Sequence, residues 1–198
     1  MLWFLFLLFL FIVFYRPIRY ELLPNLTNVK GLGVELTFVL DSIDAAIELA
    51  EKSPQWQVEI TSRDKERALN RAKAHLLVFK GAQILWVDDH PENNRNEINM
   101  FQRLGAEIRT VENTEQAIQA IQKISFDLVL SDMARGDDQQ AGLIFLKKLR
   151  TFEQKIPVIF YLGVFDPEKG VPPRSFGLTA RPDELLHLTL DALERKYY

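Results

Sequence analysis

The stretch ILWVDDHPENN, residues 84–94, decides the fold class of this chain. Four apolar residues lead directly into two adjacent carboxylates, Asp88 and Asp89, and a proline then introduces polar residues. A short apolar run that ends abruptly at polar residues is typical of a buried strand. Like charges on neighbouring residues repel each other, so two acids at the end of a strand call for an explanation.

From residue 82 onward, short apolar strands alternate with amphipathic helices. We expect strands at residues 82–87, 106–111, 126–131, 157–162 and, more weakly, 176–180. We expect helices at residues 94–104, 114–123, 141–152 and 183–195. This order predicts an α/β fold, a doubly wound five-stranded parallel sheet of flavodoxin-like type with helices on both faces. In such sheets the ligand crevice lies at the carboxyl ends of the strands.

Three acids follow strands of the predicted sheet. Asp88 and Asp89 come after the first strand and Asp132 after the third, so all three should project from one edge toward one crevice. Crowded carboxylates raise one another's pKa, so we expect a bound cation to neutralise their charge. Ligation by oxygen alone suits Mg²⁺. The alternative is that Asp88 or Asp89 simply caps the next helix.

Residues 82–195 resemble the receiver domain of two-component response regulators. ILWVDDHPENN is similar to the family's first strand with its acidic pair, and FDLVLSDM, residues 126–133, is similar to its third strand with the phosphoacceptor aspartate. The interval between the acids, 132 − 89 = 43 residues, suits the family. The resemblance implies that Asp88, Asp89 and Asp132 hold Mg²⁺ together with the backbone carbonyl of Ala134. It further implies that Asp132 takes a phosphoryl group from a phosphohistidine, with a histidine kinase or another signalling protein as partner.

Other positions depart from the family pattern. Leu162 stands where receivers have a hydroxyl, and Arg181-Pro182 stands where they have a lysine before a proline. Arg181 keeps the positive charge for a phosphoryl oxygen, but as a planar fork. The loop MARGDDQQAG, residues 133–142, is about two residues longer than the corresponding loop of the family. Proline-rich coil at 166–175 replaces the usual fourth helix. Part of the machinery that switches on phosphorylation is therefore missing.

Two non-enzymatic functions follow from this pattern. The first is a membrane-anchored receiver protein phosphorylated on Asp132, without a DNA-binding output domain. The second is a pseudo-receiver that serves protein contacts or self-association, including a homo-oligomer, without turning over phosphate. An enzyme that uses a small nucleotide is the third alternative. It lacks support because no glycine-rich phosphate loop follows a strand.

The first 15 residues, MLWFLFLLFLFIVFY, carry no charge, and Arg16 and Arg19 follow at once. We expect a transmembrane anchor at residues 1–20, although 15 helical residues reach only about 22 Å of a hydrocarbon core of about 30 Å. A cleaved signal peptide and a buried core helix are the alternatives. The arginines lie only on the C-terminal side, which predicts a single-pass protein with residues 16–198 in the cytoplasm.

Residues 21–81 are expected to form a connector and amphipathic helices ahead of a receiver-like domain at 82–198. Apolar spacing predicts a helix from residue 34 to about 53, and Thr61 with Asp64 predicts a capping box that opens a second helix. These helices are either packing elements or a signalling or self-association stalk. In the second helix Ala68, Ala72, His75 and Phe79 share a face.

Composition sets the outer bounds. With 198 residues, the chain has enough apolar surface for one core plus attachments. A formal charge of −3 and a pI near 5.7 provide no basic field for nucleic acid. The chain has no cysteine, which excludes disulfides, thiolate zinc sites and a cysteine nucleophile.

Overall fold

The computed structural model describes residues 41, 44–45, 48, 60–163 and 170–195. The predicted anchor at 1–20 and the connector that follows it lie outside the described residues. So does most of the predicted helix at 34–53, of which the four described residues are helical. Within the described part of the chain, no helix is long and apolar enough to cross a membrane. Residues 170–175, from the predicted coil at 166–175, form no helix.

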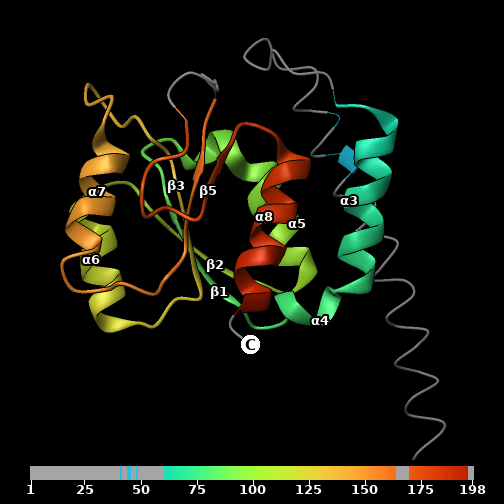
Figure 1. Ribbon diagram of the computed structural model, residues 1–198, viewed down its shortest axis with the longest axis horizontal. Coiled ribbons are helices and arrows are strands. Elements are labelled where there is room, and N and C mark those ends of the chain that lie inside the picture. The colour runs from blue at the N-terminus through green and yellow to red at the C-terminus, as the bar shows by residue number, and fades with distance from the viewer. Residues whose placement is uncertain (1–40, 42–43, 46–47, 49–59, 164–169, 196–198) are drawn as a thin grey trace, which may run out of the picture. The chain divides into compact units, whose positions relative to one another are not determined.

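The centre of the described chain is a five-stranded parallel sheet in the order β2-β1-β3-β4-β5 (Figure 1). Its strands are β1 (Gln83–Val87), β2 (Glu107–Val111), β3 (Leu128–Ser131), β4 (Val158–Tyr161) and β5 (Gly177–Thr179). All five predicted strands are confirmed, and the weakest prediction is the shortest strand. Because β1 and β3 lie inside the sheet and are buried on both faces, their sequences read as continuous apolar runs.

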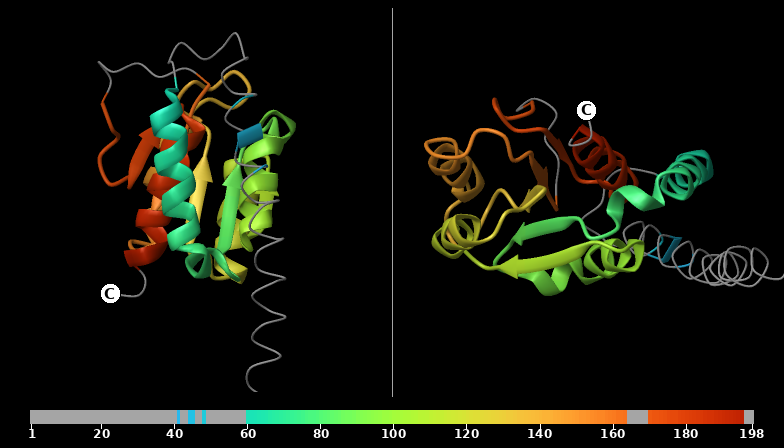
Figure 2. Two further views of the ribbon diagram at one scale, coloured as in Figure 1. Left: turned by 90° about the vertical axis from the view of Figure 1, so that its right-hand side faces the viewer. Right: turned by 90° about the horizontal axis from the view of Figure 1, so that it is seen from below.

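Helices cover both faces of this sheet. The described helices are α3 (Ser62–Ala74), α4 (Leu76–Phe79), the 3-10 turn η2 (Pro91–Asn94), α5 (Arg95–Leu104), α6 (Thr114–Lys123), α7 (Ala141–Leu149) and α8 (Pro182–Glu194). Helices α6 and α7 lie on one face, while α5 and α8 lie on the other (Figures 1 and 2). The sheet therefore separates two apolar clusters, and the four predicted crossover and terminal helices are confirmed.

Alternation along each strand divides the core between the faces. In β1, Ile84 and Trp86 pack with α5 and α8, whereas Leu85 and Val87 pack with α6 and α7. By the same rule Tyr161 and Leu162 lie on opposite faces of the sheet. Tyr161 belongs to the α5 and α8 cluster, and its hydroxyl donates to Glu97 Oε1 over 2.9 Å.

Helix α3 packs along α8 (Figure 1). Its capping box is confirmed, because the Thr61 side chain accepts from the Asp64 backbone N–H while the Asp64 side chain accepts from the Thr61 backbone N–H. Ala68 and Ala72 are fully buried in the cluster that α8 completes. Arg71 pairs with acids of α8. Of the two interpretations of this helix, packing is what the structure shows, and a role in self-association stays a prediction.

Candidate functional site

The three predicted acids meet at the carboxyl edge of the sheet. Strands β1 and β3 pair in parallel with Val87 opposite Ser131, so the residues that follow them, Asp88 and Asp132, leave the sheet side by side. One oxygen from each of Asp88, Asp89 and Asp132 lies within 4.8 Å of the others. This convergence follows from strand order alone, and it confirms the prediction from the sequence.

Asp88 is the most buried of the three acids, at 6% exposure. It accepts hydrogen bonds from the backbone N–H of His90 at 2.7 Å and from Asn94 Nδ2 at 2.5 Å, so it also organises the turn before α5. Burial raises the pKa of Asp88, and the charge of Asp89 acts in the same direction. Asp88 is not itself the N-cap residue of η2 or of α5, so the alternative that it simply caps the next helix is not what the structure shows. His90 itself is exposed.

Asp89 accepts a hydrogen bond from the loop that follows β3. Its Oδ2 accepts from the backbone N–H of Gly136 at 2.7 Å. Gly136 has φ of 56°, a left-handed conformation that glycine adopts without strain. The longer loop therefore folds back over the acids, and a hydrogen bond holds it there.

The acidity of Asp132 is strongly perturbed. Burial raises its pKa to about 6, and the charges of Asp88 and Asp89 add to the effect. Its Oδ1 accepts from the backbone N–H of Met133 at 2.6 Å. Oδ2 has no such bond among the described residues and is the oxygen available for chemistry. A carboxylate that is costly to ionise in place is stabilised by a nearby cation.

Helix α7 approaches this loop closely at Gly142. A Cβ atom at that position would lie 2.7 Å from the Asp132 carbonyl oxygen and 2.8 Å from a ring carbon of Phe160. The backbone N–H of Gly142 donates to the Met133 carbonyl at 2.8 Å. Glycine is therefore required where the helix passes behind the acid site. Ala134, whose carbonyl was predicted to bind metal, lies half-buried in the same loop.

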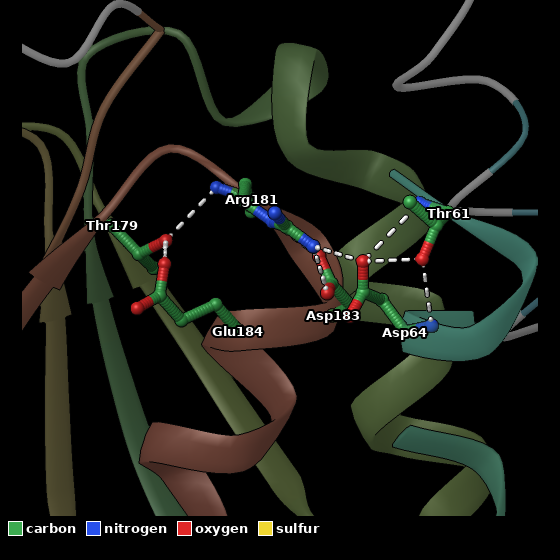
Figure 3. Close-up of polar contacts among 6 residues, drawn as sticks. All are labelled: Thr61, Asp64, Thr179, Arg181, Asp183 and Glu184. Atoms are coloured by element: carbon green, nitrogen blue, oxygen red, sulfur yellow. Dashed lines mark hydrogen bonds and ion pairs between the residues drawn. The ribbon is translucent and has the colours of Figure 1, made fainter. Parts of the chain in front are cut away.

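The other two expected site positions, Leu162 and Arg181, contact groups outside the acid cluster. Leu162 packs against the apolar cluster of α6 and α7 and offers no hydroxyl. The Arg181 guanidinium binds Asp183 through Nε at 3.1 Å and Nη2 at 2.6 Å, and its Nη2 lies 3.4 Å from Asp64 Oδ2 (Figure 3). Arg181 is thus held by carboxylates of α8 and α3. Its predicted contact with a phosphoryl oxygen stays a prediction.

One charged residue of the site escaped the sequence analysis. Arg135 is only 8% exposed, although it lies in the charged loop MARGDDQQAG, which reads as solvent-facing. Burial lowers the pKa of Arg135, whereas the charges of Asp132, Asp89 and Asp88 act to raise it. Arg135 donates to the hydroxyl groups of Ser131 and Thr114. These two polar residues are the only sequence signal for its burial, and it is a weak one because they are far from each other in the sequence.

Comparison with known proteins agrees with this geometry. Residues 84–168 match the family model of the response regulator receiver domain. By sequence match and by fold, this segment is a receiver domain. No curated protein matches the chain.

Solved receiver structures share the fold of this domain. The response regulator TrrA from Thermotoga maritima, solved in complex with Mg²⁺ and BeF, is 23% identical with a TM-score of 0.50, covering 56% of this chain and 98% of its own. The signal receiver domain of an HD domain-containing protein from Pseudomonas fluorescens Pf-5 is 20% identical with a TM-score of 0.52, covering 60% and 98%. A receiver domain protein from Clostridium thermocellum is 20% identical with a TM-score of 0.51, covering 59% and 97%. At these identities the comparison bears on fold alone.

Proposed function

We propose that this chain is a receiver protein of phosphorelay signalling in which Asp132 accepts a phosphoryl group. The observation that carries the proposal is the meeting of Asp88, Asp89 and Asp132 within 4.8 Å at the carboxyl edge of a receiver fold. The partner is a histidine kinase or another signalling protein, and the chain acts as an acceptor or adaptor.

The residues present fit Mg²⁺. The donor set contains only oxygen, and the pKa values of the buried Asp88 and the half-buried Asp132 are raised because ionisation in place is unfavourable without a cation. Asp88, Asp89 and Asp132, with the carbonyl of Ala134, would hold the ion. When bound, Mg²⁺ offsets negative charge on the transferring phosphoryl group.

The chemistry asked of Asp132 is a nucleophilic substitution at phosphorus. Its Oδ2 forms an O–P bond as the P–N bond of a phosphohistidine breaks, and the electron pair of that bond returns to the imidazole nitrogen. The Met133 N–H keeps Oδ1 in place, which orients Oδ2 toward the crevice. Asp132 must be ionised to attack, and a pKa of about 6 leaves most of it ionised at pH 7.

Slow transfer is expected, because two family groups are replaced. Leu162 donates no hydrogen bond to the phosphoryl group, and one missing donor costs about 3 kcal/mol, or roughly a hundredfold in rate. Arg181 must also leave Asp183 and Asp64 before it can reach a ligand.

Labelling with a small phosphodonor tests the proposal. Acetyl phosphate with Mg²⁺ should give an acid-stable, base-labile acyl phosphate, and Asp132→Asn should abolish it. The double variant Leu162→Thr with Arg181→Lys should label faster. If Mg²⁺ binds but neither the native nor the double variant labels, phosphotransfer is rejected.

A pseudo-receiver module is the second candidate, favoured by Leu162 and by the engagement of Arg181 with two carboxylates. In that case the domain would serve protein contacts or self-association without phosphate turnover. It is the account that survives if labelling fails in both proteins.

The apolar stretch at residues 1–15 supports a further part of the proposal, a single-pass anchor with the receiver domain in the cytoplasm. Membrane fractionation with protease protection of the C-terminus in intact cells tests it. Recovery of the full chain in the soluble fraction would contradict an anchor.

A further inference from the structure

The Arg135 guanidinium is buried among uncharged partners. Its Nη1 donates to Ser131 Oγ at 2.9 Å and to the Asp132 carbonyl oxygen at 3.2 Å, and its Nη2 donates to Thr114 Oγ1 at 3.1 Å. The Phe145 ring centroid lies 5.9 Å from its central carbon. Among the described residues, no carboxylate lies within 4.0 Å of this guanidinium. A buried cation without a paired anion is unfavourable unless negative charge lies nearby.

The acid cluster is the negative charge within reach. Asp132, Asp89 and Asp88 all interact electrostatically with Arg135, and Arg135 in turn favours the ionised form of Asp132. The interaction passes through buried protein, where charges are screened less than in water. Three acids and one buried cation thus form a single charge system at the carboxyl edge of the sheet.

The loop after β3 keeps this system together. Arg135 and Asp138 exchange two backbone hydrogen bonds, of 3.0 and 3.1 Å, which close the turn around Gly136. The N–H of Gly136 then reaches Asp89. The loop after β3 therefore binds Asp89 through Gly136 and directs the Arg135 side chain toward Thr114 of α6 and Phe145 of α7.

We propose that Arg135 is a positioning residue that acts as the internal counterion of the acid cluster. It holds Asp88, Asp89 and Asp132 together before a divalent cation arrives, and it weakens the binding of that cation by repulsion. The site thereby exchanges its metal readily. The link to Mg²⁺ rests on the proposed function, whereas the charge coupling between Arg135 and Asp132 does not.

A purely structural role for Arg135 predicts the opposite effect on metal binding. If Arg135 only fastened the loop, its loss would disorder the ligands and weaken Mg²⁺ binding. If it is the counterion, its loss removes a repulsive charge and strengthens Mg²⁺ binding. The sign of the change in affinity therefore separates the two roles.

The first experiment measures Mg²⁺ affinity by calorimetry on the full chain in detergent at pH 8. Arg135→Gln, which keeps a donor but removes the charge, should bind Mg²⁺ about three- to tenfold more tightly. Arg135→Lys should keep the native affinity. Arg150→Met is the matched control, since Arg150 is similarly buried but lies at the opposite edge of the sheet, and it should leave the Mg²⁺ affinity unchanged. If the native chain binds Mg²⁺, unchanged or weaker binding by Arg135→Gln overturns the proposal.

The second experiment needs neither metal nor phosphate. A double-mutant cycle of Arg135→Gln and Asp132→Asn is followed by urea unfolding in EDTA. Arg135→Gln should lower the unfolding midpoint at least twice as much in the native background as in Asp132→Asn. Equal shifts in both backgrounds overturn the proposal. If Arg135→Gln does not fold, Arg135→Met provides the neutral variant.

The two experiments separate failures. A chain that binds no Mg²⁺ yet shows the coupling has lost the proposed phosphotransfer function but keeps Arg135 as counterion. A chain that binds Mg²⁺ without the coupling keeps its acid site and loses the counterion.

Discussion

A buried arginine lies at each end of the parallel strands: Arg150 at the amino edge, where the strands begin, and Arg135 at the carboxyl edge, where they end. The two arginines have different kinds of partner. At the amino edge, Arg150 donates to the backbone carbonyls of Glu153, Ile156 and Arg174 at 2.8 to 3.3 Å. At the carboxyl edge, Arg135 lies beneath a cluster of acids. Arg150 provides donors to backbone carbonyls of turns. Arg135 instead lies beside three carboxylates whose combined negative charge favours binding of a cation.

Helix direction explains why the edges differ in sign. In a sheet with crossover helices, helix C-termini lie at the amino edge and N-termini at the carboxyl edge. The helix dipole favours cations at the first and anions at the second. A cavity of about 500 Å³ at the amino edge is lined by Arg150, Lys155, Arg174 and Arg195, of which Arg150 and Arg195 are the C-caps of α7 and α8. The dipole accounts for those two cations, but three acids within 4.8 Å exceed what it can stabilise.

The largest expected difference between substitutions at the two edges is in Mg²⁺ affinity. Asp89→Ala removes one of the three proposed charged ligands and should weaken Mg²⁺ affinity by about a hundredfold. Asp127→Ala, at the amino edge, should leave it unchanged, because Asp127 accepts from the Gln83 backbone N–H. Calorimetry on both variants decides. Equal affinity in Asp89→Ala and the native chain would mean that the acids only organise turns.

The next effect is on stability at the amino edge. Arg150→Met removes the donor to the backbone carbonyls of Glu153, Ile156 and Arg174 and should lower the free energy of unfolding by about 2 kcal/mol. Urea unfolding measures it, and Mg²⁺ affinity should stay native. A loss of Mg²⁺ binding in this variant would show that the two edges are not independent.

A smaller effect is the pH dependence of stability at the carboxyl edge. Burial raises the pKa of Asp132 to about 6 from 3.8, so the folded chain holds this proton more tightly than the unfolded chain. The contribution is fully present below about pH 4 and is lost as pH rises through about 6. With allowance for partial exposure, it amounts to about 1 kcal/mol.

Unfolding in EDTA between pH 4 and pH 7.5 should show this loss, and Asp132→Asn should remove it. Saturating Mg²⁺ should offset it above pH 6. A native chain whose stability is flat across this range would contradict a perturbed Asp132.

The smallest effect concerns the third arginine, Arg181, which is partly exposed. Arg181→Lys keeps the charge but loses the two-point contact with Asp183, and it should change the free energy of unfolding by less than about 1 kcal/mol. Thermal unfolding checks this. A large destabilisation would make Arg181 a structural residue and would undermine its use in the labelling experiment.

Local patterns were enough to predict most of the fold. The strands at 82–87 and 126–131 are apolar runs that end at acids, and their burial needs no knowledge of distant residues. The capping box of Thr61 and Asp64 spans one helical turn, so it also follows from neighbouring residues. The acid site could be predicted as well, because parallel strands deliver the residues that follow them to one edge.

Contacts between distant segments could not be predicted in this way. Nothing near Arg181 in sequence indicates Asp64, which lies on a helix more than a hundred residues earlier. The packing of α3 along α8 depends on both helices having faces of matching shape, and one sequence shows only that each has an apolar face.

The sequence by itself determined the parallel α/β sheet, the order of its elements and the edge at which Asp88, Asp89 and Asp132 meet. These features depend on side-chain periodicity and chain direction, which are local properties. Only the tertiary structure decided that Arg135 is buried beside those acids while Arg181 is held away by Asp183 and Asp64. Long charged side chains reach partners on other elements, and the choice among such partners is made by packing and desolvation once the chain is folded.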